Sequence, residues 1–187
     1  MKFEPLVKVQ ENKLFKISDN SEVTTENLNI VQLSDNIKDE KIPPENVLSA
    51  VVCPWKKIEL GEDNYNEELL AGLREYLKNL EEAGKFAFIV PQMQKSFGDA
   101  DEADSFIKAM VHTARRIKDC TSVLGFAVAA ELMEKDAGKK LDENSWSQWF
   151  IDEMNVKHGH YVYFAGKANV KKYGLVAKTV TNELALY

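Results

Sequence analysis

Apolar and polar positions form blocks along the chain, and the spacing within the blocks changes from strand-like to helical and back. Runs rich in apolar and β-branched residues predict strands at 29–33, 47–53, 85–90, 122–129 and 161–165. Pro54 and Pro91 are expected to stop the second and third of these strands, and a connection is expected at 55–64. Apolar residues at helical spacing predict helices from a cap at Asn66 to a stop at Gly84, and at 101–119 and 142–157. Strands without polar alternation that are separated by amphipathic helices indicate a parallel sheet, so the expected fold class is α/β.

The two ends of the chain do not follow this alternation of strands and helices. Residues 3–17 predict a β-hairpin around a polar turn at 11–13, and Pro43-Pro44 lies in a loop with at most one helical turn. A short helix is expected at 132–140. The tail is ambiguous, because Val176 and Val180 fit an extended segment whereas Leu184 fits a helix.

Composition narrows the class of protein. The 187 residues correspond to about one domain of roughly 150 residues, and they are short for a complete eight-stranded β/α barrel of about 250. A hydrophobic fraction of 44% excludes intrinsic disorder, and no apolar run approaches the roughly 20 residues that cross a bilayer. The net charge of −6 with dispersed basic residues argues against a nucleic-acid partner. The first residues lack the layout of a signal peptide, and Cys53 and Cys120 form no disulfide framework, so we expect a cytoplasmic protein without membrane contact.

Candidate binding residues are those that follow the predicted strands, because ligands of parallel α/β proteins meet the carboxyl ends of the strands. Glu131 follows an apolar strand, where desolvation can raise the pKa of its carboxyl group toward the range suited to general acid/base catalysis. Its alternative role is that of a first-turn residue of the next helix, favoured by the helix dipole. The remaining candidates are Trp55, Gln92, Gln94, Lys167 and Asn169.

Other aromatic and histidine residues have structural interpretations beside functional ones. Trp55 could stack on a sugar ring or a base, or pack in the core with its N–H satisfied. Trp146 and Trp149 share one helical stripe and are expected in the core, and His112 beside an apolar helix face is expected to pack. His158-Gly-His160 forms no zinc site without further ligands, and the chain has no glycine-rich phosphate loop. We therefore predict no metal and no cofactor.

The order of segments resembles that of cellulase-like glycoside hydrolases of clan A. The hairpin at 3–15 resembles the lead-in before their barrel. The segment Val51-Val-Cys-Pro-Trp-Lys-Lys-Ile-Glu59, followed by Tyr65-Asn-Glu-Glu-Leu-Leu70, resembles their second strand and its connection. Ala83-Gly-Lys-Phe-Ala-Phe-Ile-Val90 resembles their third strand, and Arg116-Ile-Lys-Asp119 with Val123-Leu-Gly-Phe126 the approach to the fourth.

The resemblance implies a fold, a domain layout and a candidate catalytic acid. The fold would be parallel β/α units of an incomplete TIM-type barrel with an N-terminal β-hairpin, as one domain over 1–187. Its parts would be a lead-in and first strand at 3–33, β/α units at 47–165 and a tail at 166–187. Glu131 falls on the family's general acid/base, but Ala130 stands where the family has Asn. The family's nucleophile comes from a seventh strand, which this chain is not expected to contain, and no strand clearly precedes Asn182-Glu183.

Three functions remain open on this basis. The first is a truncated cellulase-like protein that binds oligosaccharide, with catalysis lost or incomplete in one chain. The second is an active glycosidase whose site is completed across a dimer with Glu131 as acid. The third is an interaction or scaffold protein without a small-molecule site. An incomplete barrel exposes strand edges and apolar surface, so we expect a homodimer.

Overall fold

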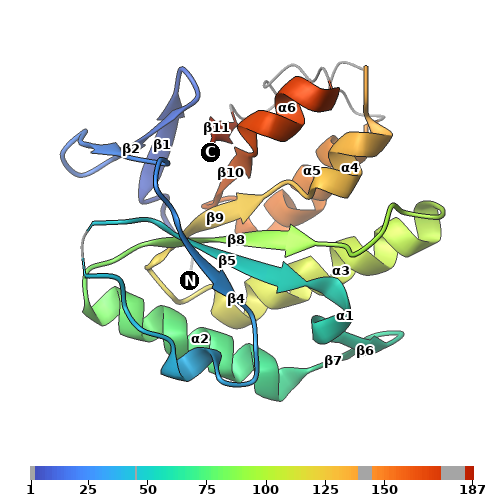
Figure 1. The fold of residues 1–187 in the computed structure, drawn as a ribbon, viewed down its shortest axis with the longest axis horizontal. Helices are drawn as coiled ribbons and strands as arrows, with labels where there is room; N and C mark the ends of the chain where they lie inside the picture. Colours follow the sequence, from blue (N-terminus) through green and yellow to red (C-terminus); the bar gives the residue numbers. More distant parts are fainter. Residues whose placement is uncertain (1–2, 45, 139–144, 174–183) are drawn as a thin grey trace.

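The centre of the molecule is a parallel six-stranded β-sheet (Figure 1). The computed structural model describes residues 3–44, 46–138, 145–173 and 184–187. The strands lie in the order β11-β10-β9-β8-β5-β4, and every neighbouring pair is parallel. Within these ranges the sheet is open, with β11 and β4 at its edges. The predicted α/β class is confirmed, as an incomplete barrel. The strand bounds are β4 (Asn29–Gln32), β5 (Ser49–Pro54), β8 (Ala87–Gln92), β9 (Val123–Ala127), β10 (Val162–Ala165) and β11 (Ala185–Leu186).

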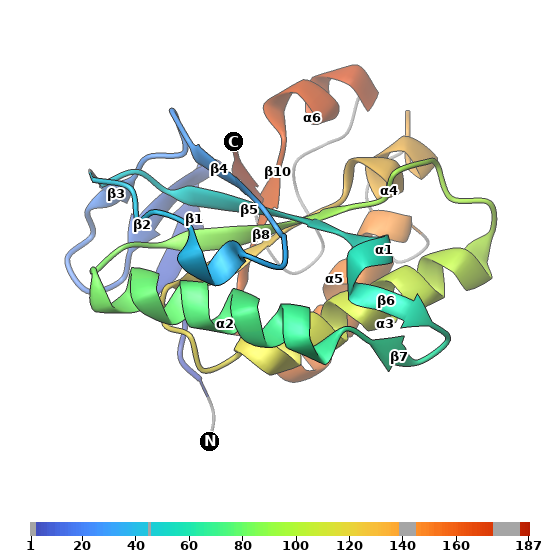
Figure 2. The same cartoon turned by 60° about the horizontal axis from the view of Figure 1, so that its bottom comes forward.

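Three amphipathic helices cover one face of the sheet, namely α2 (Glu67–Glu82), α3 (Ala100–Ile117) and α5 (Trp146–His158) (Figure 2). Each begins at a polar cap whose side chain accepts a hydrogen bond from the first turn. Asn66 Oδ1 accepts from the Leu69 N–H at 3.1 Å, and Asp99 Oδ1 from the Glu102 N–H at 2.9 Å. Their apolar faces form the main core with one side of the strands. No helix in the described ranges is long and apolar enough to cross a membrane.

A small antiparallel sheet lies beside the amino-terminal part of the large sheet (Figure 1). It consists of β1 (Val7–Gln10), β2 (Lys13–Lys16) and β3 (Glu22–Val23). The turn between β1 and β2 places Glu11 and Asn12 at φ 50° and 64°, in the left-handed region that Asn tolerates better than most residues. The predicted hairpin is therefore present. Val7 and Leu14 join a second core with Phe88 and Phe164 on the face of the sheet opposite the helices.

The connection after β5 is more ordered than the loop predicted at 55–64. β5 includes Pro54, which pairs in register with Gln92, and β8 likewise includes Pro91. A proline lacks an N–H but accepts the extended backbone of a strand end, so the two prolines lie inside the strands that they were expected to stop. The short elements on this side are η1 (Ile37–Asp39), α1 (Trp55–Ile58), β6 (Glu59–Gly61) and β7 (Asn64–Tyr65).

The C-terminal part contains elements that the sequence pattern missed. α4 (Ala130–Lys135) follows β9 and is shorter than the helix predicted at 132–140, and α6 (Lys167–Tyr173) follows β10. Leu184 is not helical but directly precedes β11, a sixth strand where five were expected. β11 exists because it pairs with β10, with Ala185 opposite Phe164. The predictions that fall on Asp142, Val176, Val180, Asn182 and Glu183 lie outside the described residues.

Candidate functional site

The carboxyl ends of the six parallel strands meet at one edge of the sheet, on the side of α1 and α4 (Figure 1). Trp55 begins α1 directly after β5, and Gln92 is the last residue of β8. Glu131 lies in the first turn of α4, just beyond β9. Lys167 and Asn169 lie in α6, directly after β10. The topology therefore places the predicted residues along one edge, in the order of their strands.

Glu131 has the first-turn position considered for it, and its carboxyl group also has a raised pKa. It is the acidic residue in the first turn of α4, at a helix terminus whose preceding residue, Ala129, provides no side-chain cap. Its side chain is half-buried, and burial raises the pKa of its carboxyl group, to which the nearby charge of Glu134 adds. Backbone N–H groups, including that of Met93 after β8, act in the opposite direction without overcoming burial. The protonated form of Glu131 is thus favoured relative to an exposed glutamate.

Tyr187 lies close enough to Glu131 for the two groups to interact electrostatically, although the sequence pattern did not single it out. Burial raises the pKa of the Tyr187 phenol to about 12, and the charge of Glu131 contributes to that rise. Its ring packs edge-on against Phe88 with centroids 5.0 Å apart. The backbone is fixed by hydrogen bonds from the Tyr187 N–H to the Ala165 carbonyl at 3.1 Å and from the Lys167 N–H to the Tyr187 carbonyl at 2.8 Å. The sequence offered one signal for Tyr187, namely that it is an aromatic residue at the end of the apolar stretch 184–187.

Asn169 belongs to the same end of the sheet as Tyr187. A Cβ atom added to Gly166 would lie 3.1 Å from Asn169 Nδ2 and 3.8 Å from Tyr187 Cζ, so both side chains approach this glycine closely. The structure therefore gathers a carboxylic acid, a phenol and an amide at the ends of β9, β10 and β11. All three groups can exchange hydrogen bonds with hydroxyl-rich ligands.

The other candidates are placed less centrally. Trp55 is only 3% exposed, packs edge-on against Phe106 at 6.1 Å, and has the Lys56 ammonium 3.6 Å from its ring centroid. These contacts agree with packing rather than with stacking on a ligand, but the buried Trp55 Nε1 has no partner in regular hydrogen-bond geometry among the described residues, so the expected satisfied N–H is not found. Gln92, Gln94 and Lys167 are exposed. Within the described part of the chain, no hydrogen bond or ion pair joins any of these side chains to Glu131.

A second carboxylate is the main requirement of glycoside hydrolysis, because retaining enzymes need two about 5 Å apart and inverting ones about 6.5–9.5 Å. Among the described residues, Glu134 is the acid whose charge acts on Glu131. It lies one turn further along the same helix, is exposed, and accepts a hydrogen bond from Ser96 Oγ at 2.6 Å. Glu134 is therefore not held across a sugar-binding cleft from Glu131.

His112, Trp146 and Trp149 pack against other side chains, the two tryptophans at the border of the core rather than inside it as expected. His112 Nε2 lies 2.8 Å from Glu67 Oε1, and its ring stacks on Tyr65 at 4.0 Å. Trp146 and Trp149 are half-buried and pack against the main core. No group of three His, Cys, Asp or Glu side chains able to hold a metal ion occurs in the ranges that the structure describes.

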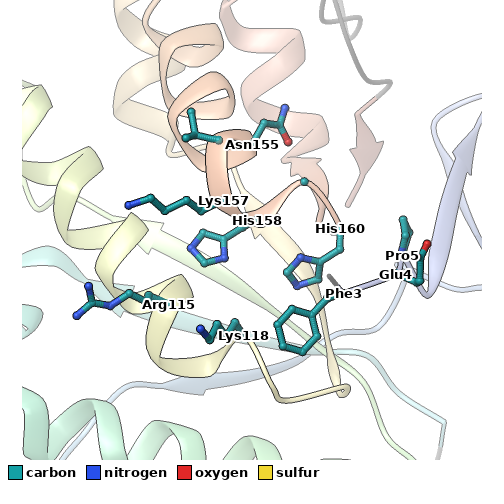
Figure 3. A pocket seen from close by; sticks show the side chains of 11 residues that line it. Phe3, Glu4, Pro5, Arg115, Lys118, Asn155, Lys157, His158 and His160 are labelled. Atoms are coloured by element: carbon teal, nitrogen blue, oxygen red, sulfur yellow. The ribbon is translucent and has the colours of Figure 1, made fainter. Parts of the chain in front are cut away.

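The largest depression lies away from this edge, near the amino ends of the strands (Figure 3). It has a volume of about 850 Å³ and is bounded by the ends of α3 and α5 and by the segment 3–5. His158 and His160, considered above for their spacing, both line it. The carboxyl edge around Glu131 thus differs from the site of this depression.

Comparison with known proteins identifies the fold but not a family. No protein-family model matches the sequence, and no curated protein does. Solved structures of similar fold include an endo-glycoceramidase II from Rhodococcus sp. in a cellobiose-like isofagomine complex. Its TM-score is 0.57 at 8% identity, over 85% of this chain and 55% of that one. PbGH5A, a glycoside hydrolase family 5 enzyme from Prevotella bryantii B14, gives 0.55 at 14% identity, over 85% and 62%.

A third similar structure contains a disaccharide. It is a GH5_18 protein from Streptomyces cattleya in complex with Manb1-4GlcNAc, with a TM-score of 0.52 at 13% identity, over 63% of this chain and 35% of that one. The present chain thus spans between 35% and 62% of the length of these three relatives. The chain has the cellulase-like β/α fold, and the resemblance stated from its sequence is confirmed at that level.

Proposed function

We propose that this chain binds oligosaccharide at the carboxyl edge of its sheet, as a cellulase-like protein in which catalysis is lost or incomplete within one chain. The observation that carries the proposal is the placement of Glu131. It lies just beyond the fourth strand with a raised pKa and with Tyr187 near it, whereas Glu134 is poorly placed as a second catalytic carboxylate. The GH5_18 protein of similar fold binds the disaccharide Manb1-4GlcNAc, which supports a sugar as the ligand class.

Each residue of the edge has a role in this proposal. Glu131 and Tyr187 exchange hydrogen bonds with sugar hydroxyls from the ends of β9 and β11. The exposed amide of Gln92 and the half-buried amide of Asn169 add donors and acceptors on either side. Gln94 and Lys167 are exposed and contribute at the periphery. Trp55 supports the edge from within the core.

Calorimetric titration with Manβ1-4GlcNAc and with cellobiose tests the binding. We expect heat of binding with the wild type, and about tenfold weaker binding for Gln92→Ala and for Asn169→Ala, since each loses hydrogen bonds to the ligand. Gln10→Ala is the matched control, because Gln10 is an exposed glutamine on β1, outside the proposed site. If the wild type bound neither sugar, the scaffold alternative would replace this proposal.

Turnover of aryl β-glycosides by the wild type and by Glu131→Gln tests the proposal that catalysis is lost or incomplete within one chain. We expect the same background rate for both proteins, because a general acid without a placed nucleophile or base does not complete either hydrolytic mechanism. Wild-type turnover that Glu131→Gln abolished would overturn the loss of catalysis. It would favour instead a glycosidase whose site is completed by a second chain.

A homodimer is part of the same proposal, and the free edge of the sheet supports it. β4 is an edge strand, and its Ile30 is 58% exposed. Sedimentation velocity of the wild type should give a dimer at micromolar concentration, and Ile30→Glu should give a monomer. Leu60→Glu, at a similarly exposed leucine on β6, should remain dimeric. A monomeric wild type would contradict the dimer without affecting the sugar site.

The proposal also places the protein in the cytoplasm. Cys53 and Cys120 are both buried and unpaired, as expected where thiols are kept reduced. Locating a fluorescently tagged chain in cells tests this, and a signal outside the cytoplasm would contradict it.

A further inference from the structure

The depression near the amino ends of the strands has a distinct chemical character (Figure 3). His160 lies just before β10, whereas Lys167 directly follows that strand, so this cavity and the proposed sugar site lie at opposite ends of it. Its walls come from three segments far apart in the sequence, namely 3–5, 115–118 and 155–160. An inference about this cavity is therefore independent of the function proposed for the carboxyl edge.

Three cationic side chains line the cavity without partners. Arg115 and Lys118 come from the end of α3, and Lys157 from the last turn of α5. All three are exposed, and within the described part of the chain none of them forms an ion pair or a hydrogen bond. Glu4 is the acidic residue among the lining side chains, so the cavity carries an excess of positive charge.

Other cations on α3 are neutralised by neighbours. Lys108 Nζ lies 2.6 Å from Asp104 Oδ2, and Arg116 donates from Nε to Glu67 Oε2 at 2.6 Å. Arg115 and Arg116 are adjacent in sequence and both exposed, yet only Arg116 has an acidic partner. Within the described part of the chain, Arg115 thus differs from Lys108 and Arg116 in having no acidic partner.

His158 provides a second, independent observation. Its side chain is 2% exposed, and within the described part of the chain neither ring nitrogen has a partner in regular hydrogen-bond geometry, although the Val111 carbonyl of α3 acts on the ring as a weak acceptor. Buried polar groups in folded proteins are nearly always paired, so an imidazole with two unpaired nitrogens requires an explanation. The ring faces the cavity between Lys157 and Lys118, with His160 and Phe3 on its other side (Figure 3). An unpaired donor and acceptor therefore lie in the wall of a positively charged cavity.

Helix termini provide the competing explanation, because basic residues at the C-terminal end of a helix complement its dipole. The basic residues of α3 and α5 do lie at such ends. However, among the described residues none of the three cations donates a hydrogen bond to a backbone carbonyl, and the dipole does not account for the unpaired imidazole. Cations from two helices also converge on one hollow, which a dipole effect on each helix separately does not require.

We propose that this cavity binds a phosphate group, either as inorganic phosphate or as a small phosphate monoester. The guanidinium of Arg115 can bind two phosphate oxygens at once, and Lys118 and Lys157 supply point charges beside it. His158 offers an N–H to the same anion. A monoester would place its organic group against the less polar rim, where Phe3 and Pro5 lie beside the 72% exposed Val156.

Calorimetric titration with inorganic phosphate and with phenyl phosphate at low salt tests the proposal. We expect the wild type to bind at least one of them, and Arg115→Gln to weaken that binding about tenfold or more. Arg116→Gln is the matched control and should leave binding unchanged, because its guanidinium is already paired with Glu67. Tighter binding of phenyl phosphate would identify a monoester as the ligand, whereas equal affinities would identify inorganic phosphate.

Histidine titration by NMR supplies a second readout. Burial and the charges of His160, Lys118 and Lys157 lower the pKa of His158 to about 4, while the Val111 carbonyl of α3 acts in the opposite direction. The charged groups Arg115, Glu4 and Glu153 also lie around the two depressions that His158 lines. A bound dianion offsets the positive charges, so the pKa of His158 should rise on saturation with phosphate in the wild type and in Arg116→Gln.

Three outcomes would overturn the proposal. They are the absence of phosphate binding at tens of millimolar, equal weakening by Arg115→Gln and Arg116→Gln, and an unchanged pKa of His158 at saturation. Sugar binding measured on the same Arg115→Gln protein separates the two sites, because it should equal that of the wild type. If the wild type binds sugar but not phosphate, the phosphate proposal has failed, and if it binds phosphate but not sugar, the sugar proposal has failed.

Discussion

Gly125 in β9 is where the structure predicts the largest effect of adding a single methyl group. A Cβ atom there would lie 2.7 Å from the carbonyl carbon of Val162 and closer still to its oxygen, whereas real Cβ contacts essentially never fall below 3.0 Å. Relief requires β9 and β10 to separate, because the obstacle is backbone. The two strands pair at three positions, Gly125, Phe126 and Ala127 opposite Val162, Tyr163 and Phe164. At about 1 kcal/mol for each hydrogen bond lost, and with buried rings displaced on both faces, Gly125→Ala should lower the free energy of unfolding by about 3 kcal/mol or more.

Urea unfolding followed by circular dichroism measures this effect, with Gly72→Ala as the matched control. Gly72 lies inside α2, where an added Cβ would contact Ile37 Cγ2 at 3.5 Å, an ordinary van der Waals distance. Alanine is the better helix former, so Gly72→Ala should raise the free energy of unfolding by about 0.5–1 kcal/mol. The same substitution should thus act with opposite signs at the two positions. A Gly125→Ala protein within about 0.5 kcal/mol of the wild type would refute the close approach of β9 and β10.

Three further predictions concern buried polar groups. Asp136 is fully buried and accepts hydrogen bonds from the Trp146 and Ser147 N–H groups at 2.9 and 2.8 Å. Asp136→Ala should therefore lower the free energy of unfolding, measured by heat or urea, by about 2–3 kcal/mol. Asp136→Asn keeps one acceptor oxygen and should lower it less. The pKa of His158 is lowered from 6.5 to about 4, so the unfolded chain binds more protons between these pH values and the folded state loses about 3 kcal/mol as the pH falls through this window. This loss should be missing from the pH profile of His158→Gln, and parallel profiles for the two proteins would contradict it. Burial raises the pKa of the Cys53 and Cys120 thiols, that of Cys120 to about 11, so a thiol reagent at pH 8 should label neither in the native protein and both in urea.

The regular part of the fold followed from the sequence because its signals are local and long. α2 and α3 carry apolar positions at helical spacing over four turns or more, and Asn66 caps α2 as expected, whereas the cap of α3, Asp99, was not predicted. β9 is apolar throughout, and β8 is apolar up to Gln92, because helices cover one face and the second core covers the other. Such patterns survive any tertiary arrangement in which the apolar residues are buried.

The elements that were missed depend on pairing rather than on pattern. β11 contains two residues, too few for any periodicity, and it is a strand because β10 offers a free edge beside it. The hairpin of β6 and β7 is similarly short. Pro54 was expected to stop the strand before it, but Pro54 is extended and pairs as the last residue of β5, and the helical turn of α1 begins at the following residue. Short elements of this kind are defined by their neighbours in space.

In the candidate site too, some features could be predicted from the sequence, whereas others depend on contacts that form only in the folded chain. The rule that ligands meet the carboxyl ends of parallel strands selected Glu131, and the structure has it at that edge of the sheet. The rule needed no knowledge of the contacts of Glu131. Whether Trp55 stacks on a ligand or packs in the core depends on α3, which brings Phe106 against it from 51 residues further along the chain. The cationic cavity could not be anticipated, because its three wall segments carry no shared motif and meet only in the folded chain.

The raised pKa of Glu131 bears on function even without hydrolysis. In a glycosidase, a protonated carboxylic acid donates its proton to the leaving oxygen, and a second carboxylate must then stabilise or attack the sugar ring. Without that partner the same acid can still donate one hydrogen bond and accept others, as a ligand rich in hydroxyl groups requires. Tyr187, whose pKa is raised to about 12, also remains neutral and offers a donor and an acceptor near Glu131. A raised pKa at Glu131 is therefore compatible both with acid catalysis and with binding of a neutral sugar. Comparing the turnover and the sugar affinity of Glu131→Gln with those of the wild type distinguishes the two.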